Sequence, residues 1–315
     1  MVPPCFSLFS RGQAVILTMV KIITAFAPWI NKAITMPYAG VDRISGGWFC
    51  KYMFDTDISH LLLVRHGESE GNANPEIYLR KGDSKLGLTE RGWHQLKGTG
   101  RFLGAYCPEV GMTKWPLIQV STHQRTLESL TGLLFGMGSV FEGDPKINPQ
   151  AFLTEKFFGA ASALEFIEDE KVPREFRDHI LHLSKAVNAH DPFSAKHLFG
   201  ESTKDTMIAA KLLMDGTISR DIQEGHRKQI IVCHGAVIQA MIMNLLHVLP
   251  KDKNKIGNPG NGDVIEIIGS RKNWTCKRIW DGEKGERISE DYKAKIHRFT
   301  VADLPPVPDF LKNGI

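Results

Sequence analysis

Two apolar runs in this sequence each end in a histidine. Residues 61–64 (Leu-Leu-Leu-Val) are followed by Arg65 and His66, and residues 230–233 (Ile-Ile-Val-Cys) are followed by His234. A short apolar run closed by polar residues is typical of a buried strand. Parallel strands end at one edge of their sheet, and open α/β folds bind ligands there. We therefore expect both histidines at one binding edge.

The residues after the first run have the properties that phosphate chemistry needs. Arg65 offers a rigid fork of donors that matches a phosphate, and His66 can act as a nucleophile that forms a covalent intermediate. Gly67 has no side chain to block the approach of a ligand to the backbone. These residues predict a site that moves phosphoryl groups.

The segment Arg65-His66-Gly67-Glu68, followed by Asn72, resembles the signature of the histidine phosphatase superfamily, which includes the cofactor-dependent phosphoglycerate mutases. Four later segments resemble further family segments in the family's order: residues 121–126, 153–159, 200–206 and 234–235. The resemblance covers roughly residues 58–270, and several ordered motifs over such a length make a chance match improbable.

The resemblance implies a role for each matching residue. It implies four catalytic residues, namely His66, Glu155, Arg65 and His234. The phosphate-binding residues that it implies are Arg65, Asn72, Arg125 and His234. Three further residues are candidates for supporting roles: Glu68, Ser121 and Glu201. Cys233 is expected in the core. His123 is expected on the surface by default, with a position at the border of the site as the alternative.

The chemistry of phosphoryl transfer explains this set. A transferring phosphoryl group spreads negative charge over its oxygens, so Arg65 and Arg125 can clamp it while a protonated His234 adds a third donor. This cationic cluster would hold His66 deprotonated, which is the form that attacks. Glu155, with a pKa raised in a closed pocket, can protonate the leaving group and later activate water.

The predicted activity is therefore hydrolysis of phosphate monoesters through a phosphohistidine on His66. It needs a small phosphorylated substrate and implies neither a cofactor nor a metal. A cofactor-dependent phosphoglycerate mutase is the first alternative, favoured locally by residues 158–160 and 205–206. Against it, Gly71 stands where those mutases usually carry a bulky aromatic residue, and no basic, proline-rich loop follows Glu155. A non-catalytic protein that binds phospho-ligands is the second alternative.

Strand-like runs alternate with helical patterns along the chain, which predicts an α/β three-layer sandwich with a mostly parallel central sheet, similar to phosphoglycerate mutases. The expected strands are residues 61–64, 117–120, 229–233, 264–268 and 275–279. The expected helices begin after Thr89 and His123 and cover residues 171–189, 202–213 and 236–246. Thr89 should cap a helix with Trp93, Leu96 and Leu103 on one face, and residues 171–189 should lie over the sheet edge.

Composition separates the ends of the chain from its body. The predicted division is an extension (1–50), a phosphatase domain (51–300) and a surface tail (301–315). Most of the net charge of +4 comes from the first 41 residues, which hold three basic and no acidic side chains. The remainder is near neutral, which gives no support for a nucleic-acid surface. Five cysteines without paired spacing favour a reducing, cytoplasmic setting.

The extension leaves several interpretations open. Residues 14–30 are strongly apolar, but Lys21 interrupts them and Pro28 breaks them, so one clean membrane-spanning helix is not expected. Helical spacing of apolar residues allows an amphipathic surface helix that associates with membranes. A basic, acid-free segment over residues 1–41 also suits organelle targeting, or a poorly ordered extension before an internal start at Met36.

Overall fold

The computed structural model describes residues 58–159, 173–196, 199–270 and 273–292. The extension (1–50) and the tail (301–315) lie outside these ranges, so the division into three parts and the role of the extension stay predictions. Within the described ranges, no helix has both the length and the apolar character needed to cross a membrane.

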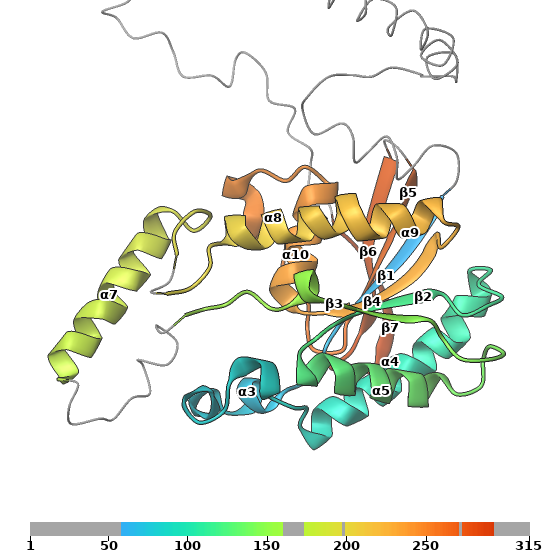
Figure 1. Cartoon of the computed structure of the whole chain (residues 1–315), viewed down its shortest axis with the longest axis horizontal. Coiled ribbons are helices and arrows are strands. Elements are labelled where there is room, and N and C mark those ends of the chain that lie inside the picture. Colours follow the sequence, from blue (N-terminus) through green and yellow to red (C-terminus); the bar gives the residue numbers. More distant parts are fainter. Residues whose placement is uncertain (1–57, 160–172, 197–198, 271–272, 293–315) are drawn as a thin grey trace, which may run out of the picture. The chain divides into compact units, whose positions relative to one another are not determined.

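Seven strands form one sheet in the order β3-β2-β4-β1-β5-β6-β7 (Figure 1). They are β1 (Ser59–Arg65), β2 (Leu117–Ser121), β3 (Ile147–Gln150), β4 (Lys228–Cys233), β5 (Val264–Ser270), β6 (Asn273–Asp281) and β7 (Glu286–Asp291). Strands β1 to β4 pair in parallel, whereas β5, β6 and β7 continue the sheet as an antiparallel meander. The predicted mixed α/β fold with a mostly parallel central sheet is confirmed.

Two edge strands, β3 and β7, were not predicted from the sequence. Strand β3 contains Pro149 and β7 is exposed along most of its length, so neither has an apolar run. Proline and continuous polarity are both tolerated at the edge of a sheet. The pattern that identifies buried strands therefore could not find them.

The helices of the described ranges are α3 (Glu70–Ala73), α4 (Glu90–Glu109), α5 (Gln124–Met137), α7 (Arg174–His190), α8 (Thr203–Leu213), α9 (Ser219–Gln223) and α10 (Gly235–Leu245). Helices α8, α9 and α10 cover one face of the sheet, and α4 and α5 cover the other (Figure 1). Single turns of 3₁₀ helix occupy Pro75–Leu79, Asp83–Lys85, Ala151–Leu153 and Pro250–Lys255, and a π-helical turn spans Met214–Ile218.

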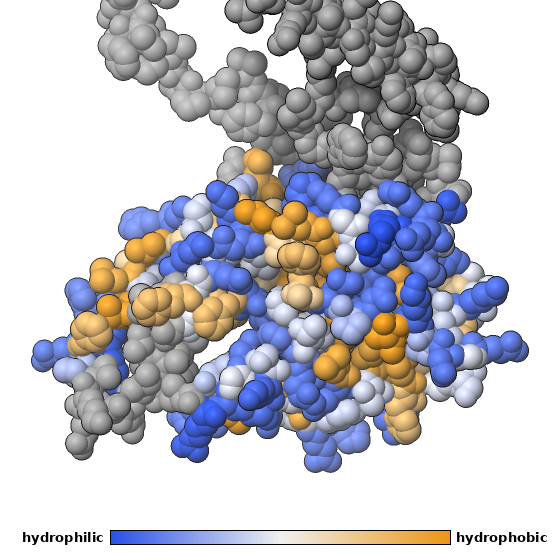
Figure 2. Space-filling model, viewed as in Figure 1, coloured by the Kyte–Doolittle hydropathy of each residue, from blue (hydrophilic) through white to orange (hydrophobic). Residues whose placement is uncertain are grey.

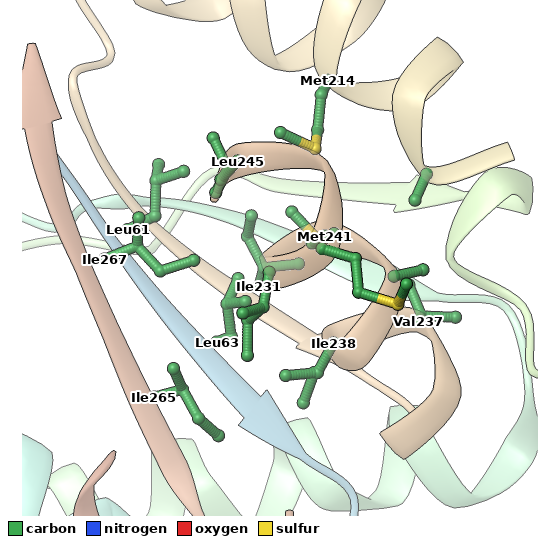
Figure 3. Close-up of a cluster of buried hydrophobic side chains, with 14 of the residues drawn as sticks. Leu61, Leu63, Met214, Ile231, Val237, Ile238, Met241, Leu245, Ile265 and Ile267 are labelled. Atoms are coloured by element: carbon green, nitrogen blue, oxygen red, sulfur yellow. The ribbon is translucent and has the colours of Figure 1, made fainter. Parts of the chain in front are cut away.

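The side chains of β1 alternate between two hydrophobic cores. Leu61 and Leu63 face α8 and α10, and Leu62 and Val64 face α4 and α5. Figure 3 shows the first core, where residues of β1, β4 and β5 contact α10. Cys233 belongs to this core and is fully buried, as expected for a structural thiol. The sheet is thus covered on both faces, which explains the continuous apolar runs of its central strands.

The predicted helix caps form, whereas the three residues expected on one face of α4 differ in burial. Thr89 accepts the Gly92 backbone N–H at the start of α4, and Ser202 forms a capping box at the start of α8. Leu96 and Leu103 are fully buried in α4, whereas Trp93 is 38% exposed. Trp93 lies at the margin of the buried stripe, where it leans on Gly132 of α5 rather than entering the core.

Helix α7 forms where the charged helical pattern predicted it. None of its residues is buried, and Phe176, Leu183 and Val187 are exposed on it. Figure 2 shows hydrophobic residues among the hydrophilic ones of this helix. Its expected place over the sheet edge stays a prediction.

Glycines let α4 and α5 approach closely beside the motif that follows β1. A Cβ at Gly100 would lie 2.1 Å from the Leu133 carbonyl oxygen, and one at Gly136 would lie 2.2 Å from the Lys97 carbonyl oxygen. Real Cβ atoms do not come so close to backbone, so the two helices would have to separate. The contact therefore requires glycine at these positions.

We expect Gly100→Ala to lower the free energy of unfolding by roughly 1–3 kcal/mol, because the added methyl overpacks the α4–α5 contact. Gly98→Ala is the matched control on the same helix, since a Cβ there meets nothing within 4 Å. This control should stabilise the protein by roughly 0.5–1 kcal/mol. Urea denaturation of both variants measures the difference. Equal stability of the two variants would contradict the packing argument.

Candidate active site

A pocket of about 900 Å³ opens at the carboxyl ends of β1, β2 and β4. The structure brings five of the sequence-predicted residues to its wall: Arg65, His66, Asn72, Arg125 and Glu155. His234 lies directly behind them, fully buried, with its ring centroid 5.0 Å from that of His66. Side chains from four separate segments of the chain therefore meet at one edge of the sheet.

The pairing of β1 with β4 places the two histidines side by side. Arg65 lies opposite Cys233 in parallel register, and the His66 backbone N–H donates to the Cys233 carbonyl at 3.0 Å. Each histidine is thus the first residue beyond its strand. Because both strands are central and buried on both faces, neither histidine can move far without breaking the sheet.

The backbone fixes the tautomer of His66. Its Nδ1 lies 2.7 Å from the carbonyl oxygen of Gly67. A carbonyl oxygen only accepts, so Nδ1 carries the proton and Nε2 keeps a lone pair. Burial, with the charges of Arg125 and Arg65, holds the pKa of His66 well below its ordinary value of 6.5. The ring is therefore neutral at physiological pH, and Nε2 can attack an electrophile.

Gly67 is needed for packing as well as for access to the pocket. A Cβ at this position would lie 2.5 Å from the carbonyl oxygen of Gly92 in the first turn of α4. The reverse contact is tighter, with a Cβ at Gly92 only 2.1 Å from the Glu68 carbonyl oxygen. The two glycines thus let the segment after β1 lie directly on α4, where Ser129 of α5 also accepts the Gly67 N–H.

Two arginines give the pocket its positive charge. Arg65 donates from one terminal nitrogen to the Pro259 carbonyl at 2.5 Å, and its buried Nε has no partner. Arg125 is 2% exposed and donates to both the carboxylate and the backbone carbonyl of Asp83 at 2.8 Å. Each guanidinium has five N–H donors, so both retain donors for an anion in the pocket.

Sequence reasoning missed Asp83 and misplaced His123. Asp83 lines the pocket, pairs with Arg125 and lies 3.7 Å from His123 Nδ1. His123 was expected on the surface, but it is 9% exposed and its ring contacts that of His234 at 4.9 Å. Asp83 stands in a polar loop, where a single acidic residue gives no signal. His123 precedes Arg125 at the end of a buried strand, and that position was the available clue.

His234 differs from its expected charge state. Burial and the nearby groups His66 and Arg125 hold its pKa well below 6.5, so it is neutral in this pocket rather than protonated. Ser121, a candidate supporting residue, contacts His234 Nε2 at 2.9 Å. When Ser121 donates to Nε2, the proton of the ring is on Nδ1, which is buried, has no other partner and faces Glu155. A neutral His234 can thus still donate one hydrogen bond.

Glu155 lies beside the two histidines at the strand ends. One of its oxygens accepts the Lys156 backbone N–H at 3.0 Å, and the other lies 3.8 Å from His234 Nδ1. Burial raises the pKa of this carboxyl above its ordinary value, against the lowering effect of the Lys156 N–H and the two arginines. A carboxyl in this state can give a proton to a neighbouring oxygen and then recover it.

The remaining predicted residues support the wall without forming its reactive part. Glu68 turns away from the pocket to accept from Thr89 and to pair with Arg91 on α4. Glu201 accepts the Phe157 backbone N–H at 2.9 Å and so anchors the segment that carries Glu155. The side-chain oxygen of Asn72 caps α3, and Asn72 lines the pocket.

A loop that sequence reasoning missed completes the base of the pocket. Asn261 donates to the His66 carbonyl at 3.1 Å, and Pro259 accepts from Arg65. Buried Asp263 holds this loop closed by accepting the Gly260 N–H at 2.6 Å and pairing with Arg278 at 2.7 Å. Glycines and asparagines in a connection are typical of any turn, so their part in the site is visible only in the folded chain.

The fold also assembles a set of metal-ligand atoms that is absent from the linear sequence. One ligand atom each from His66, Glu155 and His234 lies within 4.8 Å of the others. These are the same groups that face the two arginines. The positive charges of Arg65 and Arg125 beside this cluster disfavour a further cation and favour an anion there.

The sequence profile of the histidine phosphatase superfamily (branch 1) matches residues 61–282. The chain belongs to this family. A curated relative, the phosphoglycerate mutase-like protein AT74 of Arabidopsis thaliana, is 27% identical over 211 residues, or 65% of this chain. The matched stretch spans only 63% of that relative's length.

Solved structures share the fold at lower identity. A putative alpha-ribazole-5'-P phosphatase from Escherichia coli is 19% identical with a TM-score of 0.53, covering 70% of this chain and 96% of that one. A mycobacterial glucosyl-3-phosphoglycerate phosphatase solved with VO3 is 20% identical with a TM-score of 0.50, covering 71% and 98%. These likenesses show that both solved structures share the fold of this chain.

The charge of Arg125 should be measurable in the titration of His66. We expect Arg125→Met to raise the pKa of His66, because the substitution removes a positive charge that disfavours protonation. Arg91→Met is the control, since this arginine is 59% exposed on α4 and does not line the pocket. Two-dimensional NMR of the imidazole nitrogens measures the pKa and the tautomer. An unchanged pKa in Arg125→Met would contradict the electrostatic argument.

Proposed function

We propose that this protein is a phosphatase that hydrolyses phosphate monoesters through a phosphohistidine on His66. One observation carries the proposal: the Gly67 carbonyl holds the proton on Nδ1, leaving a neutral Nε2 between two arginines. A nucleophile without charge among buried cations is suited to attack a dianionic phosphoryl group. Membership of the superfamily supports the same reaction class.

In the first step, His66 Nε2 forms a bond to phosphorus while the bond from phosphorus to the ester oxygen breaks. Arg65 and Arg125 donate to the equatorial oxygens, where the negative charge is spread. Asn72 and His234 Nδ1 can donate further hydrogen bonds to the same oxygens. The ester oxygen leaves with the proton of Glu155, whose raised pKa keeps that proton available.

In the second step, a water molecule attacks the phosphorus of phospho-His66. Glu155, now a carboxylate, takes a proton from the water as the bond to Nε2 breaks, and inorganic phosphate is released. The proton given away in the first step is thus recovered. The first step needs a proton donor and the second needs a proton acceptor. A buried carboxyl with a raised pKa can take both roles.

A phosphoglycerate mutase would use the same first step but return the phosphoryl group to a sugar-acid hydroxyl instead of water. Gly71 stands where those mutases usually carry an aromatic residue, and a Cβ at Gly71 would lie 2.5 Å from the Tyr78 hydroxyl oxygen. Tyr78 therefore fills that space from another segment. Release of inorganic phosphate, measured beside conversion of 3-phosphoglycerate with its bisphosphate cofactor, separates the two activities.

His66→Ala should abolish the covalent intermediate and nearly all turnover, because no neighbouring nucleophile can replace Nε2. Reactions with a radiolabelled phosphate ester, stopped in alkaline denaturant, would show label on the wild-type protein that is stable in alkali and lost in acid, and no label on the variant. Assays with a chelator should leave turnover unchanged. Wild-type protein that binds phosphate esters without acquiring label would instead indicate the non-catalytic binding protein.

Glu155→Gln should slow turnover of alkyl phosphates by about a hundred- to ten-thousand-fold, since their alkoxide needs a proton on leaving. The loss should be much smaller for nitrophenyl phosphate, whose leaving group is already a weak base. Asp83→Asn is the matched comparison, because Asp83 also lines the pocket but pairs with Arg125. Equal losses on both esters in Glu155→Gln, or a leaving-group effect in Asp83→Asn instead, would move the acid role away from Glu155.

A further inference from the structure

The pocket is much larger than a phosphoryl group requires. Its volume of about 900 Å³ is that of a site for a whole drug-sized molecule. Arg65, His66 and Arg125 form the end where the phosphoryl group binds. The segment after Glu155, the start of α8 and the 3₁₀ turn at Pro250–Lys255 line the remainder. The leaving group of the substrate must therefore occupy this second part.

Two lysines line this second part of the pocket. Lys156 follows Glu155 and is 8% exposed, and Lys253 projects from the 3₁₀ turn after α10. Lys253 donates to the Thr203 hydroxyl at 2.9 Å, which fixes its ammonium group beside the first residue of α8. Burial lowers the pKa of both lysines, and the charge of Lys253 further lowers that of Lys156, against the raising effect of Glu201, Glu155 and Asp205. Both ammonium-bearing side chains line the same pocket.

The acidic groups around these lysines have other partners. Glu201 accepts the Phe157 N–H, and Asp205 accepts from Ser202 and pairs with Lys196 at 3.0 Å. No carboxylate in the described ranges lies within ion-pair distance of Lys156 or Lys253. Glu201, Glu155 and Asp205 act on Lys156 only from beyond ion-pair distance, so an anion bound in the pocket between the two ammonium groups would stabilise both charges more directly.

We propose that Lys156 and Lys253 form a second anion site, so that the substrate is a phosphate monoester whose leaving group ends in another anionic group, a phosphate or a carboxylate. The positive end of the α8 dipole beside Thr203 favours the same charge. Phe157 and Phe158 line the pocket next to Lys156 and offer apolar surface to the body of the leaving group. This inference rests on the proposed phosphatase function and adds its substrate class.

Alkanediol bisphosphates of increasing chain length test the proposal against alkyl monophosphates of the same length. For the wild-type protein, kcat/KM is divided by the number of phosphate groups in each compound. This value should be about tenfold to a hundredfold higher for the bisphosphate than for the monophosphate over one range of chain lengths, as expected for a charge-assisted contact. Alkyl phosphates that end in a carboxylate, run in parallel, show which anion the site prefers. Dissociation constants of the same compounds for His66→Ala give a readout that does not depend on turnover.

The variants locate the effect. Lys253→Met should abolish the preference for the second anion, and Lys253→Arg should retain most of it. Lys255→Met is the matched control in the same turn, because Lys255 is 70% exposed and pairs with Asp252. Thermal unfolding of each variant confirms that it is folded. Equal kcat/KM for mono- and bisphosphates at every length, or a preference unchanged in Lys253→Met, would overturn the proposal.

The assays distinguish failure of the proposed phosphatase function from failure of the second anion site. If the wild-type protein does not hydrolyse nitrophenyl phosphate, the phosphatase assignment fails. The second anion site would still be supported if the bisphosphate binds more tightly than the monophosphate and if this difference is lost in Lys253→Met. Hydrolysis of nitrophenyl phosphate without any preference for a second anion would refute the anion site alone.

Discussion

The parallel hydrogen bonding between β1 and β4 sets the distance between His66 and His234, and the site is arranged around that distance. The pairing continues one residue past β1, where the His66 N–H reaches the Cys233 carbonyl. Both strands lie in the middle of the sheet with a hydrophobic core on each face. The histidines are therefore held by the most stable part of the fold, while the groups that must admit substrate come from loops and helix ends.

Positive charge has to be kept in the pocket before any substrate arrives, and the structure shows how. Arg65 is stabilised by the Pro259 carbonyl and Arg125 by Asp83, so neither guanidinium is buried without a partner. Both histidines remain neutral under this positive potential. In the proposed reaction, the same positive potential would bind a phosphate and keep the nucleophile unprotonated. One electrostatic arrangement would then serve binding and reactivity together.

The two ends of the pocket have different structural origins. The reactive end is made by residues that follow central strands, and its geometry is therefore tied to the fold. The outer end is made by Lys156, Lys253 and neighbouring side chains on irregular segments, which can change without disturbing the sheet. Shared fold and shared reaction are thus compatible with different leaving groups among proteins of the same superfamily. The substrate of this chain must be sought in its outer pocket.

The sequence by itself determined the central strands, the capped helices and the order of the motif residues, because buried runs, cap residues and short signatures are local patterns. It also placed Arg65, His66, Glu155 and His234 in one site. Tertiary structure decided the neutral state of His234, since burial and neighbouring charges set that pKa. It likewise decided the inward position of His123 and the edge strands β3 and β7. The parts played by Asp83 and the two lysines depend on segments far apart in the chain, and only folding brings these together.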